Sequence, residues 1–146
     1  MTVAAVIALC AAYVIGSMPT AYLVGRWHGV DLRTVGSGNL GATNVVRTFG
    51  WPWGAVVYLV DVTKGVVPVL WLPTVAGVAA GWPWAPLFGV IAIVGHVRPV
   101  FLLGRGGGKG VATASGVFFA LAPMAALCAT GAFVLTVVIT RYVSLG

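Results

Sequence analysis

Residues 2–24 read TVAAVIALCAAYVIGSMPTAYLV, an apolar run without a charged side chain. A helix needs about 20 predominantly apolar residues to cross the hydrocarbon core of a bilayer. This run therefore predicts a membrane-spanning helix, interrupted by Gly16-Ser17 and Pro19. Because the run has no basic start and is long for the apolar part of a signal peptide, we expect it to be retained as the first span.

Further apolar runs predict the rest of a helix bundle. Residues 51–72 supply a second span and residues 76–95 a third, one end of which is marked by Trp82 and Trp84. Residues 111–140 are too long for one upright helix, and Pro123 divides them into a short helix at about 111–121 and a span at 123–140. The expected fold is an all-α integral membrane protein, with one domain over residues 1–146 and about five membrane helices.

Composition supports a membrane protein and excludes several other classes. Of the residues, 60% are hydrophobic and 7% charged, and Asp31 and Asp61 are the only acids, too few charges to cover a soluble surface. The net charge of +6 does not indicate nucleic acid, because the Lys and Arg residues stand singly. Cys10 and Cys128 lie in apolar runs far from either histidine, so neither a metal site nor a cofactor is predicted.

The distribution of cations predicts the topology. Two loops, residues 25–50 and 95–110, lie on one side of the membrane if three spans precede the second loop. They hold Arg26, Arg33, Arg47, Arg98, Arg105 and Lys109. Since cytoplasmic loops carry the excess of Lys and Arg, we expect both loops and Arg141 to be cytoplasmic and the N-terminus to be outside.

The first polar loop reads VGSGNLGATNVVR over residues 35–47. It contains G-x-G-x-x-G, but the strand and soluble sheet that a dinucleotide site requires are not predicted around it. Its glycines allow a ligand to approach the backbone closely. Ser37, Asn39, Thr43 and Asn44 offer neutral donors and acceptors, and the guanidinium of Arg47 suits a phosphate.

The second polar loop reads GHVRPVFLLGRGGGKGVAT over residues 95–113. The Walker A pattern fails, because Leu103 replaces its first Gly and Gly110 follows Lys109 in place of Ser or Thr. The simpler feature is a glycine-rich turn that leads into a helix, with Lys109 at the junction. Exposed N–H groups at the positive end of a helix predict an anion site there.

Structural roles compete with binding roles at several positions. Glycines also serve close helix packing in membranes, and single cations such as Arg26 and Arg98 also fix topology. His96 is either a packed residue or a base. Asp61 and Lys64 stand three residues apart on one helix face, and we expect them to form a mutually neutralising structural pair.

Taken in order, these motifs resemble a known family. G-S-G-N-x-G-A-T-N-x-x-R, D-x-x-K-G, G-H-x-x-P-V-F and G-G-K-G-V-A-T are similar to motifs of the bacterial acyl-phosphate:glycerol-3-phosphate acyltransferases, over essentially the whole chain. The resemblance implies acyl transfer from acyl phosphate to the 1-hydroxyl of glycerol 3-phosphate. The products would be lysophosphatidic acid and phosphate, in the first step of phospholipid synthesis at the bacterial inner membrane.

The resemblance also implies site residues and partners. Catalytic roles fall to Ser37, Arg47 and Lys109. Substrate- or phosphate-binding positions are Gly36, Gly38, Asn39, Gly41, Thr43, Asn44, His96, Gly106, Gly107, Gly108, Gly110, Thr113 and Ser144. The expected partners are acyl phosphate, glycerol 3-phosphate and the lipid bilayer.

Members of that family continue into further spans, so we expect missing C-terminal spans on a longer or a second chain. Two other functions stay open. One is a truncated or non-catalytic paralogue that binds phosphate or anionic lipid, or acts as a partner subunit. The other is a small anion transporter or channel, which a divided helix at 111–140 would suit.

Overall fold

The computed structural model describes residues 2–77 and 84–141, and the regular structure within them is helical throughout. The elements are α1 (Val3–Ser17), α2 (Thr20–Trp27), α3 (Ala42–Phe49), α4 (Trp51–Val75), α5 (Trp84–Val97), the 3-10 helix η1 (Val100–Leu102), α6 (Val111–Leu121) and α7 (Pro123–Thr140). Four helical segments are long and apolar enough to cross a membrane: Val3–Trp27, Trp51–Val75, Trp84–Leu102 and Pro123–Thr140. With the shorter α6, they agree with the predicted bundle of about five membrane helices.

The first predicted span, residues 2–24, consists of two helices. α1 ends at Ser17, and α2 begins at Thr20 and continues to Trp27. Pro19 lies between them, and a proline removes one N–H from a helix while its ring collides with the carbonyl one turn earlier. The break therefore leaves backbone groups near the middle of an apolar segment that need other partners.

The third predicted span, residues 76–95, differs from the structure at both ends. Ala76 and Gly77 form the turn that ends α4, where Gly77 has φ +66° and its N–H donates to the Thr74 carbonyl. A glycine in the left-handed region is a common end for a helix. The next described helix, α5, runs from Trp84 to Val97, while Trp82 lies outside the described residues.

The other end of the chain follows the predicted division. Ala122 is non-helical at φ −146° and ψ 69°, and Pro123 begins α7. The bounds of α6 and α7 are therefore the predicted 111–121 and 123–140. The helix α3, in contrast, was not predicted, because its eight residues contain no apolar run long enough to stand out.

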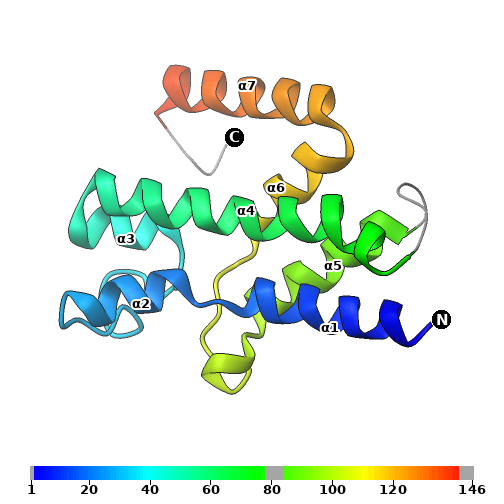
Figure 1. Cartoon of the computed structure of the whole chain (residues 1–146). Coiled ribbons are helices and arrows are strands. Elements are labelled where there is room, and N and C mark those ends of the chain that lie inside the picture. Colours follow the sequence, from blue (N-terminus) through cyan, green and yellow to red (C-terminus); the bar gives the residue numbers. More distant parts are fainter. Residues whose placement is uncertain (1, 78–83, 142–146) are drawn as a thin grey trace.

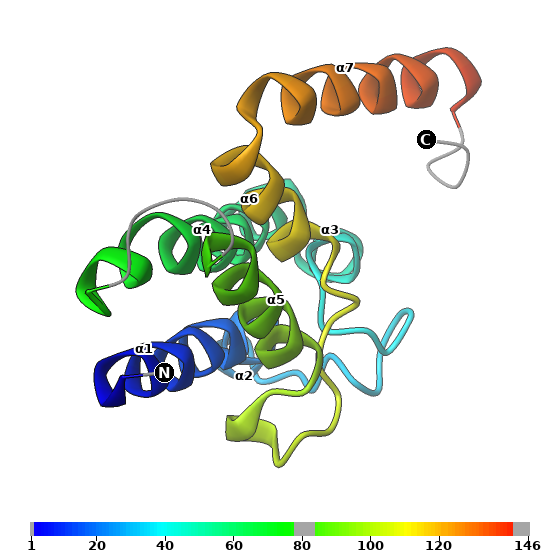
Figure 2. The same ribbon diagram turned by 90° about the vertical axis from the view of Figure 1, so that its right-hand side faces the viewer.

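α4 is the central helix and contacts α1, α2, α3, α5 and α6 (Figures 1 and 2). Glycines allow these contacts to be close. A Cβ at Gly65 would lie against the Thr113 carbonyl of α6, and one at Gly116 against the Val62 carbonyl of α4. α7 packs mainly on α6 and has most of its surface exposed.

Gly116→Val should destabilise the protein far more than Gly131→Val does. A side chain at Gly116 must push α6 from α4, whereas a Cβ at Gly131 of α7 meets no atom within 4 Å. Overpacking of this kind costs about 1–3 kcal/mol of unfolding free energy. Thermal unfolding in detergent measures the difference, and the second variant controls for the helix propensity of valine. Equal losses in the two variants would contradict the α4–α6 contact.

Candidate functional site

Asn44, which is 1% exposed, lies beneath the first polar loop and fixes its backbone by hydrogen bonds. Its Nδ2 donates to the carbonyls of Leu32 (3.2 Å) and Val35 (3.1 Å), and its Oδ1 accepts the N–H of Ser37 at 3.0 Å. Gly36, with φ +59°, lies so close to Oδ1 that a Cβ would overlap it. The amide of Asn44 is therefore engaged by the backbone of its own loop.

The outer surface of this loop carries its reactive groups. Ser37, Thr43 and Arg47 are exposed. Helix α3 begins after Gly41, and its start has no side-chain cap. N–H groups in the first turn of a helix have no partner within the helix. The loop thus offers a hydroxyl, a guanidinium and an uncapped helix start.

The second polar loop has the predicted form of a glycine-rich turn entering a helix. Gly106 and Gly110 have φ +71° and +80°, and Gly110 is the residue before α6. The start of α6 has no side-chain cap, and Lys109 beside it is exposed. A cation and free N–H groups at a helix start form an environment that favours an anion.

The two loops touch one another at Gly108. A Cβ there would lie 2.8 Å from the carbonyl oxygen of Leu40 and would overlap Nε2 of His96. Leu40 immediately precedes the Gly41 that starts α3, and Gly108 stands just before the Gly110 that starts α6. The contact therefore brings the two uncapped helix starts into the same region.

Most of the cations near these loops have no carboxylate to neutralise them. Asp31 binds Arg33 at 2.6 Å, and the hydrogen bonds from Arg33 lower the pKa of Asp31 to about 2, so this pair stays charged at neutral pH. Asp61, the other acid, binds Lys64. In the described part of the chain no acidic side chain is left for Arg26, Arg47, Arg98, Arg105, Lys109 and Arg141.

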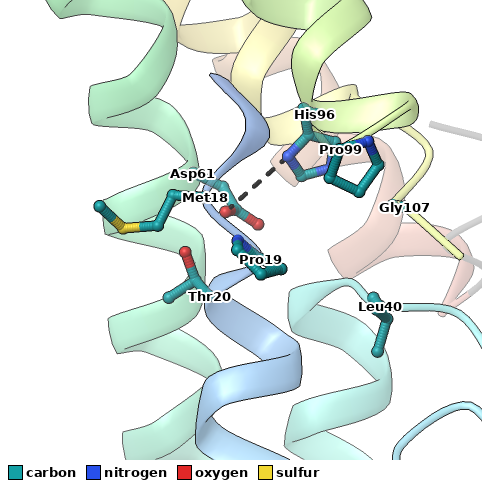
Figure 3. A pocket seen from close by; sticks show the side chains of 9 residues that line it. Met18, Pro19, Thr20, Leu40, Asp61, His96, Pro99 and Gly107 are labelled. Carbon is teal, nitrogen blue, oxygen red and sulfur yellow. Dashed lines mark ion pairs between the residues drawn. The ribbon is translucent and has the colours of Figure 1, made fainter. Parts of the chain in front are cut away.

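A polar cluster lies behind the loops, inside the bundle. Lys64 Nζ donates to Asp61 Oδ1 at 2.6 Å, which confirms the predicted pair. His96 Nδ1 lies 3.9 Å from the same oxygen, across a cavity of about 10 Å³, the room that one water molecule needs (Figure 3). The sequence did not indicate that His96 and Asp61 meet, because they belong to different helices.

The predicted site residues divide by exposure. The exposed ones are Gly36, Ser37, Thr43, Arg47, Gly106 and Lys109, the partly exposed ones are Gly38, Asn39, Gly41 and Gly107, and the buried ones are Asn44, His96, Gly108, Gly110 and Thr113. Thr113 is fully buried beside Gly65, and its hydroxyl has no hydrogen-bond partner among the described residues. Ser144 lies outside the described residues. The cavity of Figure 3 is not lined by Ser37, Arg47 or Lys109, so it does not test their predicted catalytic roles, which stay predictions.

Comparison with known proteins identifies relatives over nearly the whole chain. Residues 6–146 match the family model described as glycerol-3-phosphate acyltransferase. The chain is 46% identical to the glycerol-3-phosphate acyltransferase of Trichlorobacter lovleyi, covering 94% of this chain and 69% of that protein. It is 48% identical to the enzyme of the same name from Geobacter sulfurreducens, covering 92% and 68%.

Solved structures agree with the sequence relatives. The crystal structure of PlsY, an integral membrane glycerol 3-phosphate acyltransferase, in its glycerol 3-phosphate form has a TM-score of 0.86 and 40% identity, covering 97% of this chain and 69% of that one. The lysophosphatidic acid form has a TM-score of 0.83 and 38% identity, with 97% and 68% covered.

Proposed function

The chain belongs to the glycerol-3-phosphate acyltransferase family, and we propose that it transfers an acyl group from acyl phosphate to the 1-hydroxyl of glycerol 3-phosphate. It is accordingly an integral membrane transferase of phospholipid synthesis. The observation that carries the proposed reaction is the contact between two glycine-rich loops, each with an exposed cation and an uncapped helix start. Both substrates carry a phosphate, so the reaction needs two anion sites that lie close together.

The proposed reaction transfers the acyl group directly between the substrates and needs no covalent intermediate with the protein. The acceptor hydroxyl oxygen bonds to the acyl carbon, and the bond from that carbon to the phosphate oxygen breaks. Phosphate leaves with the electron pair, and the hydroxyl proton passes to a substrate phosphate oxygen. Because acyl phosphate is already activated, catalysis consists mainly of positioning and of stabilising charge.

We assign the two anions to different groups. Ser37, Arg47 and Lys109 hold the acceptor phosphate, and the N–H groups of residues 106–110 cradle the donor phosphate. The exposure of these three side chains supports the first assignment. The uncapped start of α6 supports the second. The acyl chain then lies along apolar helix faces in the bilayer.

Helix α7 supports a further proposal about partners. Leu127, Thr130, Gly131, Val134 and Val138 lie on one exposed, mainly apolar face of it. The relatives are longer, since this chain spans 69% of the Trichlorobacter lovleyi protein. We propose that additional spans, on a longer chain or a second one, pack against this face and close the acceptor side of the site.

A direct assay tests the reaction and the partner together. The chain is purified alone, and with a second chain holding the part of the Trichlorobacter lovleyi relative that it does not match. We expect lysophosphatidic acid from acyl phosphate but not from acyl-CoA, with far more formed in the two-chain sample. Formation of lysophosphatidic acid from acyl-CoA but not from acyl phosphate would refute acyl phosphate as the donor. Equal activity of the single chain would refute the partner, and phosphate binding without any turnover would favour the non-catalytic alternative.

We also propose that the protein is a multi-pass protein of the bacterial inner membrane, with its N-terminus outside and both polar loops cytoplasmic. The contact between Leu40 and Gly108 supports a common side for the loops. In Figure 1 the C-terminal end of α7, which leads to Arg141, lies toward the N-terminal end of α4, beside which α3 lies. The excess of loop cations supports the cytoplasmic side.

Cysteine labelling checks this topology. Cys10 and Cys128 are exposed and are first replaced by serine. Single cysteines at the exposed positions of His28 and Arg105 should resist a membrane-impermeant thiol reagent added to whole cells, while one at Thr2 should react. Inverted vesicles should give the reverse pattern. Labelling of either loop position in whole cells would reverse the proposed topology.

A further inference from the structure

We infer that Asp61, Lys64 and His96 are positioning residues that hold the second polar loop in place from inside the bundle. Their contacts run from the break between α1 and α2, through α4 and α5, to Gly108. The consequence for catalysis rests on the proposed function. The contacts themselves do not.

The first link joins α4 to the helix break. Lys64 Nζ donates to Asp61 Oδ1 at 2.6 Å and to the Met18 carbonyl at 2.5 Å. Met18 immediately precedes Pro19, where the first span is interrupted. The side chains of Lys64 and Asp61 are only 4% and 3% exposed, so each depends on the other for compensation of its charge.

The second link joins α4 to α5. Nδ1 of His96 faces Asp61 Oδ1 at 3.9 Å, beyond hydrogen-bond distance but close enough for a charge to act in a low-dielectric interior (Figure 3). Thr20 lines the same cavity, and its buried hydroxyl has no partner among the described residues. The carboxylate of Asp61 thus favours one orientation of the imidazole ring.

The third link joins α5 to the polar loop. Nε2 of His96 lies against Gly108, where even a methyl group would overlap it, and Gly107 lies against the carbonyl oxygens of His96 and Val97. The ring therefore cannot rotate toward Gly108 unless Gly108 moves. Lys109 follows Gly108 directly, so the buried cluster sets the position of the exposed cation.

The test uses a variant that removes both charges together. Loss of one partner leaves an unpaired buried charge, whereas replacement of both by neutral groups is often close to neutral for stability. Asp61→Asn/Lys64→Met should therefore unfold near the parent temperature in detergent. It should nevertheless bind inorganic phosphate at least tenfold more weakly, and in the lysophosphatidic acid assay raise KM more than it lowers kcat. Thr63→Val, at an exposed position of the same helix, should change none of these quantities.

A spectroscopic readout separates positioning from a general structural effect. His28 and His96 are the only histidines, so His28→Gln leaves His96 as the single source of ring signals in protein labelled with 15N-histidine. His28 is exposed and stacks on Phe49 with ring centroids 4.5 Å apart, away from the cluster. We expect the His96 ring nitrogens to shift in the double variant and not in Thr63→Val.

The outcomes decide between the two proposals. Unchanged His96 signals and unchanged phosphate affinity in the folded double variant would overturn the positioning role, whatever the activity. Altered signals and weaker phosphate binding, with no lysophosphatidic acid formed by the parent even in the two-chain sample, would support positioning and refute the proposed reaction. If the double variant fails to fold, Asp61→Glu serves the same comparison, because its longer carboxylate keeps the charge but displaces the ring.

Discussion

Gly108→Val is expected to lower kcat/KM for lysophosphatidic acid formation by at least a hundredfold. The added side chain must enter the space between His96 Nε2 and the carbonyl of Leu40, which lies 2.8 Å from the position of a Cβ. The second loop then moves away from the first, and the phosphates lose their relative alignment. Positioning accounts for about 7–11 kcal/mol of a bimolecular barrier, so partial loss is enough for this effect.

Gly104→Val is the matched control in the same loop. Gly104 has φ +71°, so a side chain there incurs a left-handed backbone cost of about 1–2 kcal/mol, yet a Cβ would meet no atom within 4 Å. We expect this variant to lose some stability and to keep kcat/KM within about tenfold of the parent. The assay uses detergent-solubilised protein whose folding is checked by thermal unfolding. Parent-like activity of Gly108→Val would show that the loops need not touch.

The helices that were predictable are those governed by local chemistry. A long apolar run has few alternatives to a membrane helix, and Pro123, which lacks a backbone N–H, suits the first turn of α7, where that N–H would have no helical partner. The break at Pro19 was visible as an interruption, but the partners of its backbone were not, because the Met18 carbonyl accepts the Thr20 N–H and also a bond from Lys64 of another helix. α3 was missed because eight mixed residues carry little local signal.

The candidate site shows the same division. Two glycine-rich segments with a cation beside each predicted anion sites, and each segment leads into a helix whose start has no side-chain cap. A binding role for Asn44 stays a prediction, and the structure adds that its amide bonds the backbone of its own loop. Sequence spacing shows that an amide is present, but not which partner it has. The meeting of His96 with Asp61 likewise depends on how α4 and α5 pack.

Lys109→Ala should weaken the binding of phosphate substrates by about 1.5–3 kcal/mol, the range for hydrogen bonds to charged groups. This corresponds to roughly ten- to a hundredfold in the dissociation constant. Lys109 is exposed at the start of α6, and no acidic side chain in the described part of the chain neutralises it. Lys109→Arg should restore binding only in part, because a planar guanidinium differs in geometry from an ammonium. Arg105→Ala, which removes another exposed cation of the same loop, should have little effect.

Arg47→Ala should cause a similar loss, and the double variant reveals whether the two cations hold the same anion. If Arg47 and Lys109 bind one phosphate, removal of Arg47 also weakens the contact between that phosphate and Lys109. The losses in binding free energy should then not add. Titration of glycerol 3-phosphate into the parent, the two single variants and the double variant measures this coupling. Strictly additive losses would place the cations at separate sites. The contact between Leu40 and Gly108 would then serve only to pack the loops.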